Sequence, residues 1–175
     1  QFVWETGLLE EIGRLVGMER ALPRGVSDVT DTIIETAARG ARGPLIWGGM
    51  KQAAAQAFEP GAAGTRVAGR LVEFARAHGD RVRLHGVGHS AGSIFQAHLL
   101  RRLDALDSPA FETLTFLAPA ITVADYARLV DPLVPGRAKR LRLFTMAKDY
   151  ELADNVAFAY RKSLLYLIHR ALEPR

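Results

Sequence analysis

The sequence predicts an α/β protein with a mainly parallel sheet, and three observations lead to this fold class. Short β-prone runs alternate with longer segments of helical periodicity through the second half of the chain. This order requires crossover connections, which are right-handed and join parallel strands. A glycine-rich stretch, residues 86–92, separates one of these runs from the helix that follows it. The chain has 175 residues, of which 49% are hydrophobic, so it suits one domain with a substantial core.

The first third of the chain is predicted to be mainly helical. Residues 2–4 resemble the end of a β-strand. Residues 8–16, 27–38 and 45–58 carry apolar side chains at helical spacing, with glycine and proline in the breaks between them. We therefore expect three helices before residue 60.

Strands and helices alternate along the rest of the chain. In chain order, the predicted elements are a helix over residues 65–78, a strand over 82–84, a helix over 93–106, a strand over 113–117, a short helix or irregular segment over 121–130, a strand over 141–145 and a helix over 155–172. Pro109 and Pro119 stand where a predicted helix and a predicted strand end.

Composition and charge limit the partners and the compartment. The 23 Lys and Arg residues are scattered among 19 Asp and Glu residues, without a basic stripe or a nucleic-acid motif, so we expect no nucleic-acid partner. No apolar run approaches the roughly 20 residues of a membrane span, and we expect no signal peptide. The absence of cysteine excludes disulfides and thiolate metal sites and favours a reducing compartment, which predicts a cytoplasmic protein.

Residues 88–92 read Gly-His-Ser-Ala-Gly and fit the pattern G-x-S-x-G. In that pattern a serine occupies a strained turn between a strand and a helix, and the flanking glycines keep bulky side chains out of the crowded backbone. A strand is predicted before the motif and a helix after it. Ser90 is therefore the candidate nucleophile, and the backbone N–H of Ala91 is the candidate oxyanion donor.

The same glycines also resemble a dinucleotide-binding loop, in which backbone amides approach a pyrophosphate at a helix N-terminus. Such a fold needs a charged residue at the end of the next strand, roughly 20 residues after the loop. The strand over 113–117 is followed by Ala-Pro-Ala, and Asp104 and Asp107 come too early. The nucleophile interpretation explains more of these residues.

On this motif and the elements around it, residues 65–172 resemble the central and C-terminal part of an α/β-hydrolase. The resemblance implies a three-layer α/β/α fold and catalytic residues in the order Ser, Asp or Glu, then His. It also implies that residues 141–145 form the strand before the catalytic acid. Asp149 matches the family's spacing best, Asp154 is the next candidate and Glu151 the third. Alternatively, this acidic cluster caps the helix expected to start near residue 155, for which Asp154 is well placed.

The sequence does not show the family's base in its usual loop. Of the five histidines, only His169 follows the candidate acids, and it falls in a segment of helical periodicity. His89 is expected to point away from the Ser90 hydroxyl. Asp125 and Asp131 are alternative acids, although solvated loop residues are the default interpretation.

The resemblance has two consequences for the organisation of the chain. The missing base and the missing second oxyanion donor lead us to expect one α/β-hydrolase-like domain over residues 1–175, incomplete at both ends. Residues 7–62 have no counterpart in a minimal hydrolase. We expect them to form a helical insertion that shapes or covers the acyl pocket.

The resemblance implies a serine hydrolase that cleaves an ester or related acyl bond of a small-molecule substrate through an acyl-enzyme on Ser90. Asp149 or Asp154 would orient the histidine, and neither a cofactor nor a metal is required. Acyl transfer to an acceptor other than water would use the same residues. The alternative is a non-catalytic binding module of the same fold, which the lack of an evident triad histidine favours.

Overall fold

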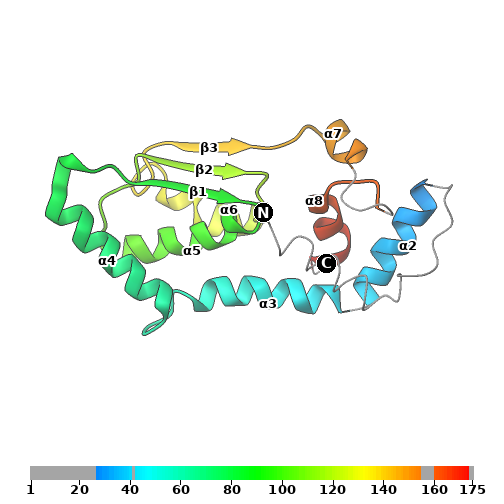
Figure 1. The fold of residues 1–175 in the computed structure, drawn as a ribbon, viewed down its shortest axis with the longest axis horizontal. Coiled ribbons are helices and arrows are strands. Elements are labelled where there is room, and N and C mark those ends of the chain that lie inside the picture. Colours follow the sequence, from blue (N-terminus) through cyan, green and yellow to red (C-terminus); the bar gives the residue numbers. More distant parts are fainter. Residues whose placement is uncertain (1–26, 41, 155–159, 174–175) are drawn as a thin grey trace. The chain divides into compact units, whose positions relative to one another are not determined.

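The computed structural model describes residues 27–40, 42–154 and 160–173 (Figure 1). The chain divides into two compact units, residues 1–49 with 146–175 and residues 50–145. The predicted strand over 2–4 and the predicted helix over 8–16 lie outside the described residues.

The second unit contains a three-stranded parallel sheet. Its strands, in the spatial order β1-β2-β3, are β1 (His85–His89), β2 (Thr113–Leu117) and β3 (Leu141–Phe144). The helices are α4 (Ala63–His78), α5 (Gly92–Ala105) and α6 (Val123–Leu129), with short 3-10 turns at Gly79–Arg81 and Asp131–Leu133. Because a helix lies between each pair of successive strands, the predicted α/β class with a parallel sheet is confirmed.

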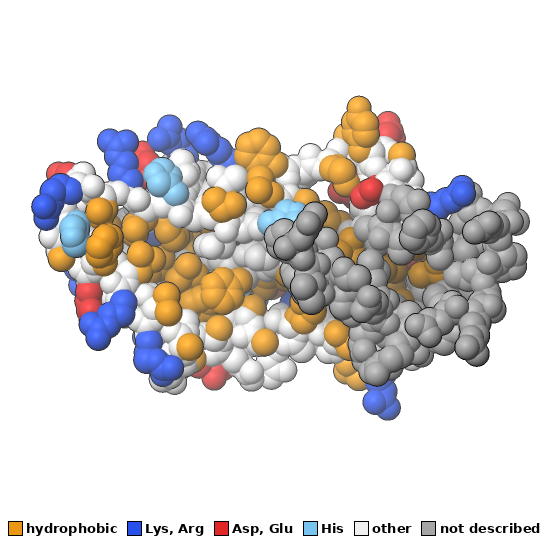
Figure 2. All heavy atoms as spheres, in the orientation of Figure 1, with side chains coloured by type: hydrophobic (Ala, Val, Ile, Leu, Met, Phe, Trp, Pro, Cys, Tyr) orange, Lys and Arg blue, Asp and Glu red, His pale blue; other side chains and the backbone are white. Residues whose placement is uncertain are grey.

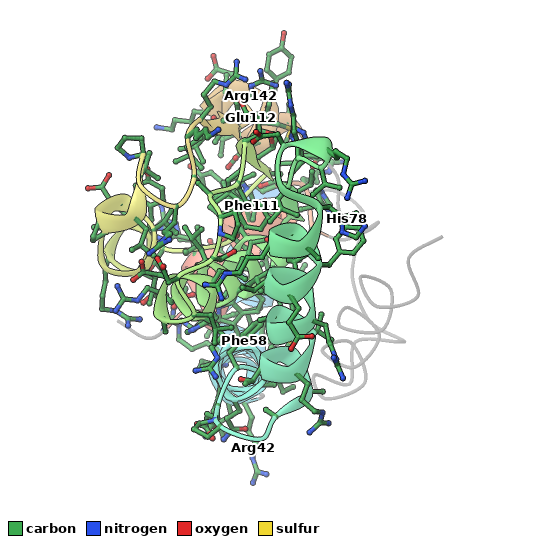
Figure 3. All side chains as sticks on the ribbon, turned by 90° about the vertical axis from the view of Figure 1, so that its left-hand side faces the viewer. Arg42, Phe58, His78, Phe111, Glu112 and Arg142 are labelled. Atoms are coloured by element: carbon green, nitrogen blue, oxygen red, sulfur yellow. The ribbon has the colours of Figure 1, made fainter. Side chains whose placement is uncertain are left out.

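The core of this unit lies between the helices and one face of the sheet. Leu114 and Phe116 of β2 are fully buried and belong to the same cluster as Leu100 of α5 and Val72 of α4. Burial of one such large apolar side chain stabilises the fold by about 1.5–3 kcal/mol. Phe111 also lies in this interior, whereas His78 projects outward from the end of α4 (Figure 3).

The opposite face of the sheet is open to solvent over much of its area. Side chains alternate between the two faces along a strand, and the exposed positions of β1 are His85, Val87 and His89. Val87 is 58% exposed, and Phe144 at the end of β3 is 56% exposed. The described part of this unit is therefore a sheet with helices packed on one face.

The first strand lies three residues later than predicted. The β-prone run 82–84 leads into β1 without belonging to it, and Gly86 and Gly88, predicted to form a turn, are strand residues. Both face the core side of the sheet. A Cβ on Gly86 would lie 2.8 Å from Leu114 Cδ1, and one on Gly88 would lie 2.7 Å from the Gly92 carbonyl oxygen. Glycine therefore occurs in this strand because neighbouring groups approach its backbone closely.

Five predicted helices occur in the structure with shifts of a few residues at their ends. The segments 27–38 and 45–58 correspond to α2 (Ser27–Gly40) and α3 (Gly43–Gln56). The segments 65–78, 93–106 and 121–130 correspond to α4, α5 and α6. Their apolar spacing was sufficient to identify them.

The helix predicted over residues 155–172 is confirmed for residues 164–172 and is wrong for residues 160–163, and residues 155–159 lie outside the described part of the chain. The helix α7 (Lys148–Ala153) precedes this segment, and α8 (Leu164–Leu167) begins only after Ser163, whose hydroxyl accepts the Tyr166 N–H. A π-helical turn, Ile168–Leu172, follows. Contacts with α2 compete with helix formation over residues 160–163, because the Arg161 N–H donates to Asp31 at 3.0 Å.

Buried polar contacts connect the elements of the first unit. Asp31 is 1% exposed, and its carboxylate lies 3.4 Å from Lys162 Nζ. The Tyr160 hydroxyl donates to Glu35, and burial together with this carboxylate raises the pKa of Tyr160. Trp47 is buried and donates to Glu173 at 2.6 Å. These contacts fasten the segment 160–173 to α2 and to the start of α3.

Among the described helices, none combines the length and the apolar character that crossing a bilayer requires.

Candidate nucleophile turn

Ser90 directly follows β1 at the carboxyl end of the parallel sheet and begins the short turn that leads into α5. Its φ is 51°, in the left-handed region, which costs a residue other than glycine roughly 1–2 kcal/mol. The Ser90 N–H donates to the Leu117 carbonyl at 2.9 Å and so continues the β1–β2 hydrogen bonding by one residue. The backbone thus adopts the strained strand-to-helix turn that the G-x-S-x-G pattern describes.

The two glycines of the motif have different steric surroundings. A Cβ on Gly88 would lie 2.7 Å from the carbonyl oxygen of Gly92 and 2.9 Å from the nitrogen of Ser93, both backbone atoms. A Cβ on Gly92 would meet no atom within 4 Å. Only the first glycine is therefore required by close backbone contact, which corrects the expectation that both exclude bulky side chains.

The N-terminus of α5 supplies unpaired backbone donors beside Ser90. Neither the Ala91 nor the Gly92 N–H donates to a residue in the described part of the chain, and no side chain caps the helix. The free N–H groups and the helix dipole make this end electropositive. An oxyanion that formed on a substrate next to Ser90 would be stabilised here, with Ala91 as the nearer donor in sequence.

The Ser90 hydroxyl itself has no hydrogen-bonding partner among the described residues, although the residue is only 7% exposed. All five histidines of the sequence are described, and each lies in another environment. His85 Nδ1 is 2.8 Å from Thr113 Oγ1 at the start of β1, and His78 Nδ1 is 2.9 Å from the Phe74 carbonyl oxygen.

The remaining histidines also contact other groups or solvent. His89 is exposed on the open face of the sheet, and His169 is exposed in the π-helical turn of the first unit. His98 lies half-buried on α5, where burial and the nearby Arg128 lower its pKa and the Asp125 carboxylate opposes them. None of the three is hydrogen-bonded to Ser90 in the described structure.

The candidate acids occupy different positions. Asp149 is exposed in the first turn of α7, and Asp154 is the extended residue that follows this helix. The residues that follow Asp154, where the capping interpretation expected a helix to start, lie outside the described residues. Glu151 is half-buried, and its carbonyl accepts the Ser163 N–H at 2.8 Å. All three belong to the first unit and Ser90 to the second, so the pairing of an acid with this serine stays a prediction.

The alternative acids lie after β2 in the second unit. Asp125 is 2.6 Å from Arg128 Nη2. Burial raises the pKa of Asp125, but the hydrogen bond and charge of Arg128 outweigh it and bring this pKa below its ordinary value. Asp125 is therefore engaged in an ion pair within α6. Asp131 is exposed in the following 3-10 turn.

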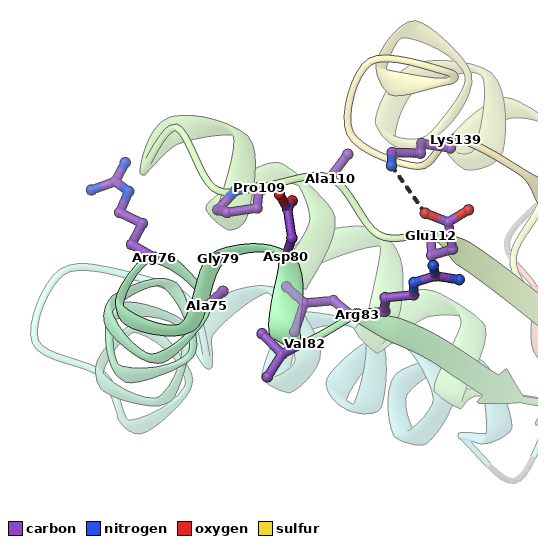
Figure 4. Close-up of a pocket in the computed structure, with 11 residues that line it drawn as sticks. Ala75, Arg76, Gly79, Asp80, Val82, Arg83, Pro109, Ala110, Glu112 and Lys139 are labelled. Atoms are coloured by element: carbon purple, nitrogen blue, oxygen red, sulfur yellow. Dashed lines mark hydrogen bonds and ion pairs between the residues drawn. The ribbon is translucent and has the colours of Figure 1, made fainter.

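A cavity of the second unit lies at the opposite edge of the sheet, where the strands begin (Figure 4). It encloses about 620 Å³ between the end of α4 and residues 109–112. Its charged groups are largely paired, since Glu112 binds both Lys139 and Arg140, and Arg76 donates to the Leu106 carbonyl. Basic side chains gather around this end with acidic ones among them (Figure 2). Ligands of open parallel sheets usually bind at the carboxyl edge, where Ser90 lies.

The dinucleotide alternative is disfavoured by the position of the glycines. Gly86 and Gly88 lie within β1, and only Ser90 and Ala91 separate this strand from α5. A pyrophosphate-binding turn needs its glycines in the loop between strand and helix. The described connection is too short to supply such a loop.

Sequence reasoning missed the contribution of Ser93 and of the residues after β2. Ser93 is fully buried and donates to the Ser90 carbonyl, while Ala120 donates to the same oxygen. A serine in the first turn of a helix often bonds the carbonyl three residues before it, so Ser93 could have been singled out from its spacing. Nothing in the sequence indicated that residue 120 returns to the nucleophile turn.

No protein-family model, curated protein or solved structure matches this chain. The resemblance to α/β-hydrolases therefore rests on the motif, the order of the elements and the geometry of the turn. The described residues contain no group of three or more His, Asp or Glu side chains placed to hold a metal ion.

Proposed function

We propose that this protein is a serine hydrolase of the α/β-hydrolase type that cleaves an ester or related acyl bond of a small molecule, with Ser90 as the nucleophile. The observation that carries the proposal is a serine hydroxyl on a left-handed backbone between β1 and the N-terminus of α5. Strain of this kind persists where the surrounding structure holds it, and it concentrates at functional sites. The Ala91 and Gly92 N–H groups, which donate to no residue in the described part of the chain, could stabilise negative charge on the substrate beside Ser90.

The proposal includes a three-layer α/β/α fold. Parallel sheets are ordinarily covered on both faces, whereas Val87 and Phe144 leave apolar surface exposed on the face away from α4, α5 and α6. A second helical layer on that face would bury these side chains. This supports the three-layer arrangement over the two layers of the described residues.

In the proposed reaction, the Ser90 oxygen attacks the acyl carbonyl carbon while its proton passes to a histidine imidazole. The carbonyl electrons move onto oxygen, where the Ala91 N–H stabilises the oxyanion. Collapse of this intermediate breaks the bond to the leaving group, and the imidazolium gives its proton to the leaving oxygen, which departs as the alcohol. Water then attacks the acyl-enzyme, releases the acid and regenerates the Ser90 hydroxyl. Asp149 or Asp154 orients the imidazole.

The test is covalent labelling of the full-length protein with a fluorophosphonate, in which Ser90 Oγ displaces fluoride from phosphorus. We expect an adduct on the peptide that contains Ser90, its loss in Ser90→Ala, and its retention in Ser108→Ala, which changes another buried serine of the same unit. Hydrolysis of p-nitrophenyl acetate should fall about 10⁴-fold or to background in Ser90→Ala. The enzyme proposal would be contradicted if the folded wild type were not labelled, or if Ser90→Ala were labelled as strongly as the wild type.

The same experiment identifies the catalytic acid and distinguishes the hydrolase from the competing function. Whichever of Asp149→Asn and Asp154→Asn slows labelling of Ser90 by about 100-fold or more identifies the orienting carboxylate. The competing function is a non-catalytic binding module, and one observation favours it: none of the five histidines is hydrogen-bonded to Ser90. A folded wild type that neither reacts with the probe nor hydrolyses the ester supports the binding module.

A further inference from the structure

We infer that Ser93 is a positioning residue that aims the oxyanion donor of the proposed hydrolase, and this inference rests on the proposed function. Its hydroxyl acts on the peptide group between Ser90 and Ala91.

The Ser90 carbonyl is held by three donors. The Ser93 N–H lies 3.0 Å from this oxygen, the Ser93 hydroxyl 2.7 Å, and the Ala120 N–H 3.1 Å. The Ser93 hydroxyl also accepts the Ile121 N–H at 3.1 Å. One buried hydroxyl therefore joins the nucleophile turn to the loop after β2.

The peptide plane between Ser90 and Ala91 links the direction of the Ser90 carbonyl to that of the proposed oxyanion donor. The Ser90 C=O and the Ala91 N–H belong to the same planar trans peptide, in which the two bonds point in opposite directions. Donors that fix the direction of the carbonyl therefore fix the direction of the Ala91 N–H as well. This N–H is free of acceptors among the described residues. Ser93 thus determines the direction of the proposed oxyanion donor without touching the substrate.

Ser93 is well suited to this role because it is fully buried. Loss of its hydroxyl leaves the Ile121 N–H without its acceptor and removes one donor from the Ser90 carbonyl. Water has no access to replace a group that is 0% exposed, so the turn would relax toward other orientations of the peptide. The left-handed φ of Ser90 adds strain that favours such relaxation.

The experiment measures fluorophosphonate labelling and p-nitrophenyl acetate hydrolysis by the full-length protein. In Ser93→Ala we expect the labelling rate constant and kcat to fall about tenfold or more, with KM within about twofold, because an oxyanion donor acts in the transition state. The matched control is Ser108→Ala. That serine is also buried, but its hydroxyl donates only to the Pro109 carbonyl, so both rates should stay near those of the wild type.

If Ser93→Ala does not fold, two further variants test the role of the Ser93 hydroxyl. Ser93→Thr retains the hydroxyl and should restore most of the labelling rate, whereas Ser93→Cys fills similar space with a weak donor and should react more slowly than Ser93→Thr. A labelled wild type with unchanged rates in the Ser93 variants overturns this inference alone. A wild type that is not labelled overturns the proposed function and the inference together.

Discussion

Two neighbouring strands of the sheet end in the same backbone conformation. Ser90 after β1 has a φ of 51° and Ala118 after β2 a φ of 42°. Each donates its N–H to the last residue of the next strand, Ser90 to Leu117 at 2.9 Å and Ala118 to Phe144 at 2.7 Å. The left-handed turn therefore belongs to the way these parallel strands end and is not by itself a mark of catalysis.

The two turns differ in their side chains and in the segments to which they lead. The first turn carries a hydroxyl and leads at once into α5, whose first N–H groups have no acceptor among the described residues. The second carries a methyl group and continues through Pro119 to Ala120, whose N–H returns to the Ser90 carbonyl. The first turn thus offers reactive groups, and the second supports it. A strained residue marks a candidate site only together with its side chain and the helix after it.

The largest expected effect tests the steric basis of the first turn. Gly88→Ala should lower the free energy of unfolding by about 3 kcal/mol, because the new Cβ would contact rigid backbone atoms of Gly92 and Ser93. Urea unfolding at 25 °C measures this. Gly92→Ala is the matched control and should stay within about 1 kcal/mol of the wild type, since its Cβ enters open space at the start of α5. Equal effects of the two substitutions would contradict the difference between these glycines.

A smaller effect compares the two turns directly. Ala118→Gly and Ser90→Gly should each raise the free energy of unfolding by about 0.5–1 kcal/mol, because glycine relieves the left-handed strain. Only Ser90→Gly should abolish fluorophosphonate labelling. Thermal unfolding and labelling of both variants check this. If Ala118→Gly also abolished labelling in a folded protein, the second turn would have a role beyond support.

The smallest expected effect is a pH dependence of stability that arises from His98. The helices that follow the two turns, α5 and α6, pack together, and His98 of α5 lies near Asp125 and Arg128 of α6. Burial lowers the pKa of His98 below its ordinary value of 6.5 in the folded state. The unfolded chain therefore binds a proton first as the pH falls below 6.5, and stability declines until the folded pKa is reached. The unfolding free energy of the wild type should therefore be lower at pH 5.5 than at pH 7.5 by a contribution from His98. His98→Gln should remove this contribution. The exposed control His89→Gln should retain it.

Particular elements show why sequence reasoning succeeded or failed. The helices α4 and α5 were predictable because their apolar spacing reflects the face that each one buries. The strand β1 was misplaced because Gly86 and Gly88 read as a turn, although they are small to admit neighbouring groups. The segment 160–163 was predicted as helix because local periodicity says nothing of a distant carboxylate such as Asp31 that binds its backbone.

For the candidate site, the sequence by itself determined the motif, the position of Ser90 between a strand and a helix, and the candidacy of Asp149 and Asp154. These depend only on spacing and on the side chains present. Only the tertiary structure decided which glycine is sterically required, that Ser93 and Ala120 hold the Ser90 carbonyl, and that Ala118 repeats the strained conformation. The physical reason is that close approach and hydrogen bonding join residues that lie up to about thirty positions apart in the chain, and a local pattern of side chains does not record which backbone groups will meet.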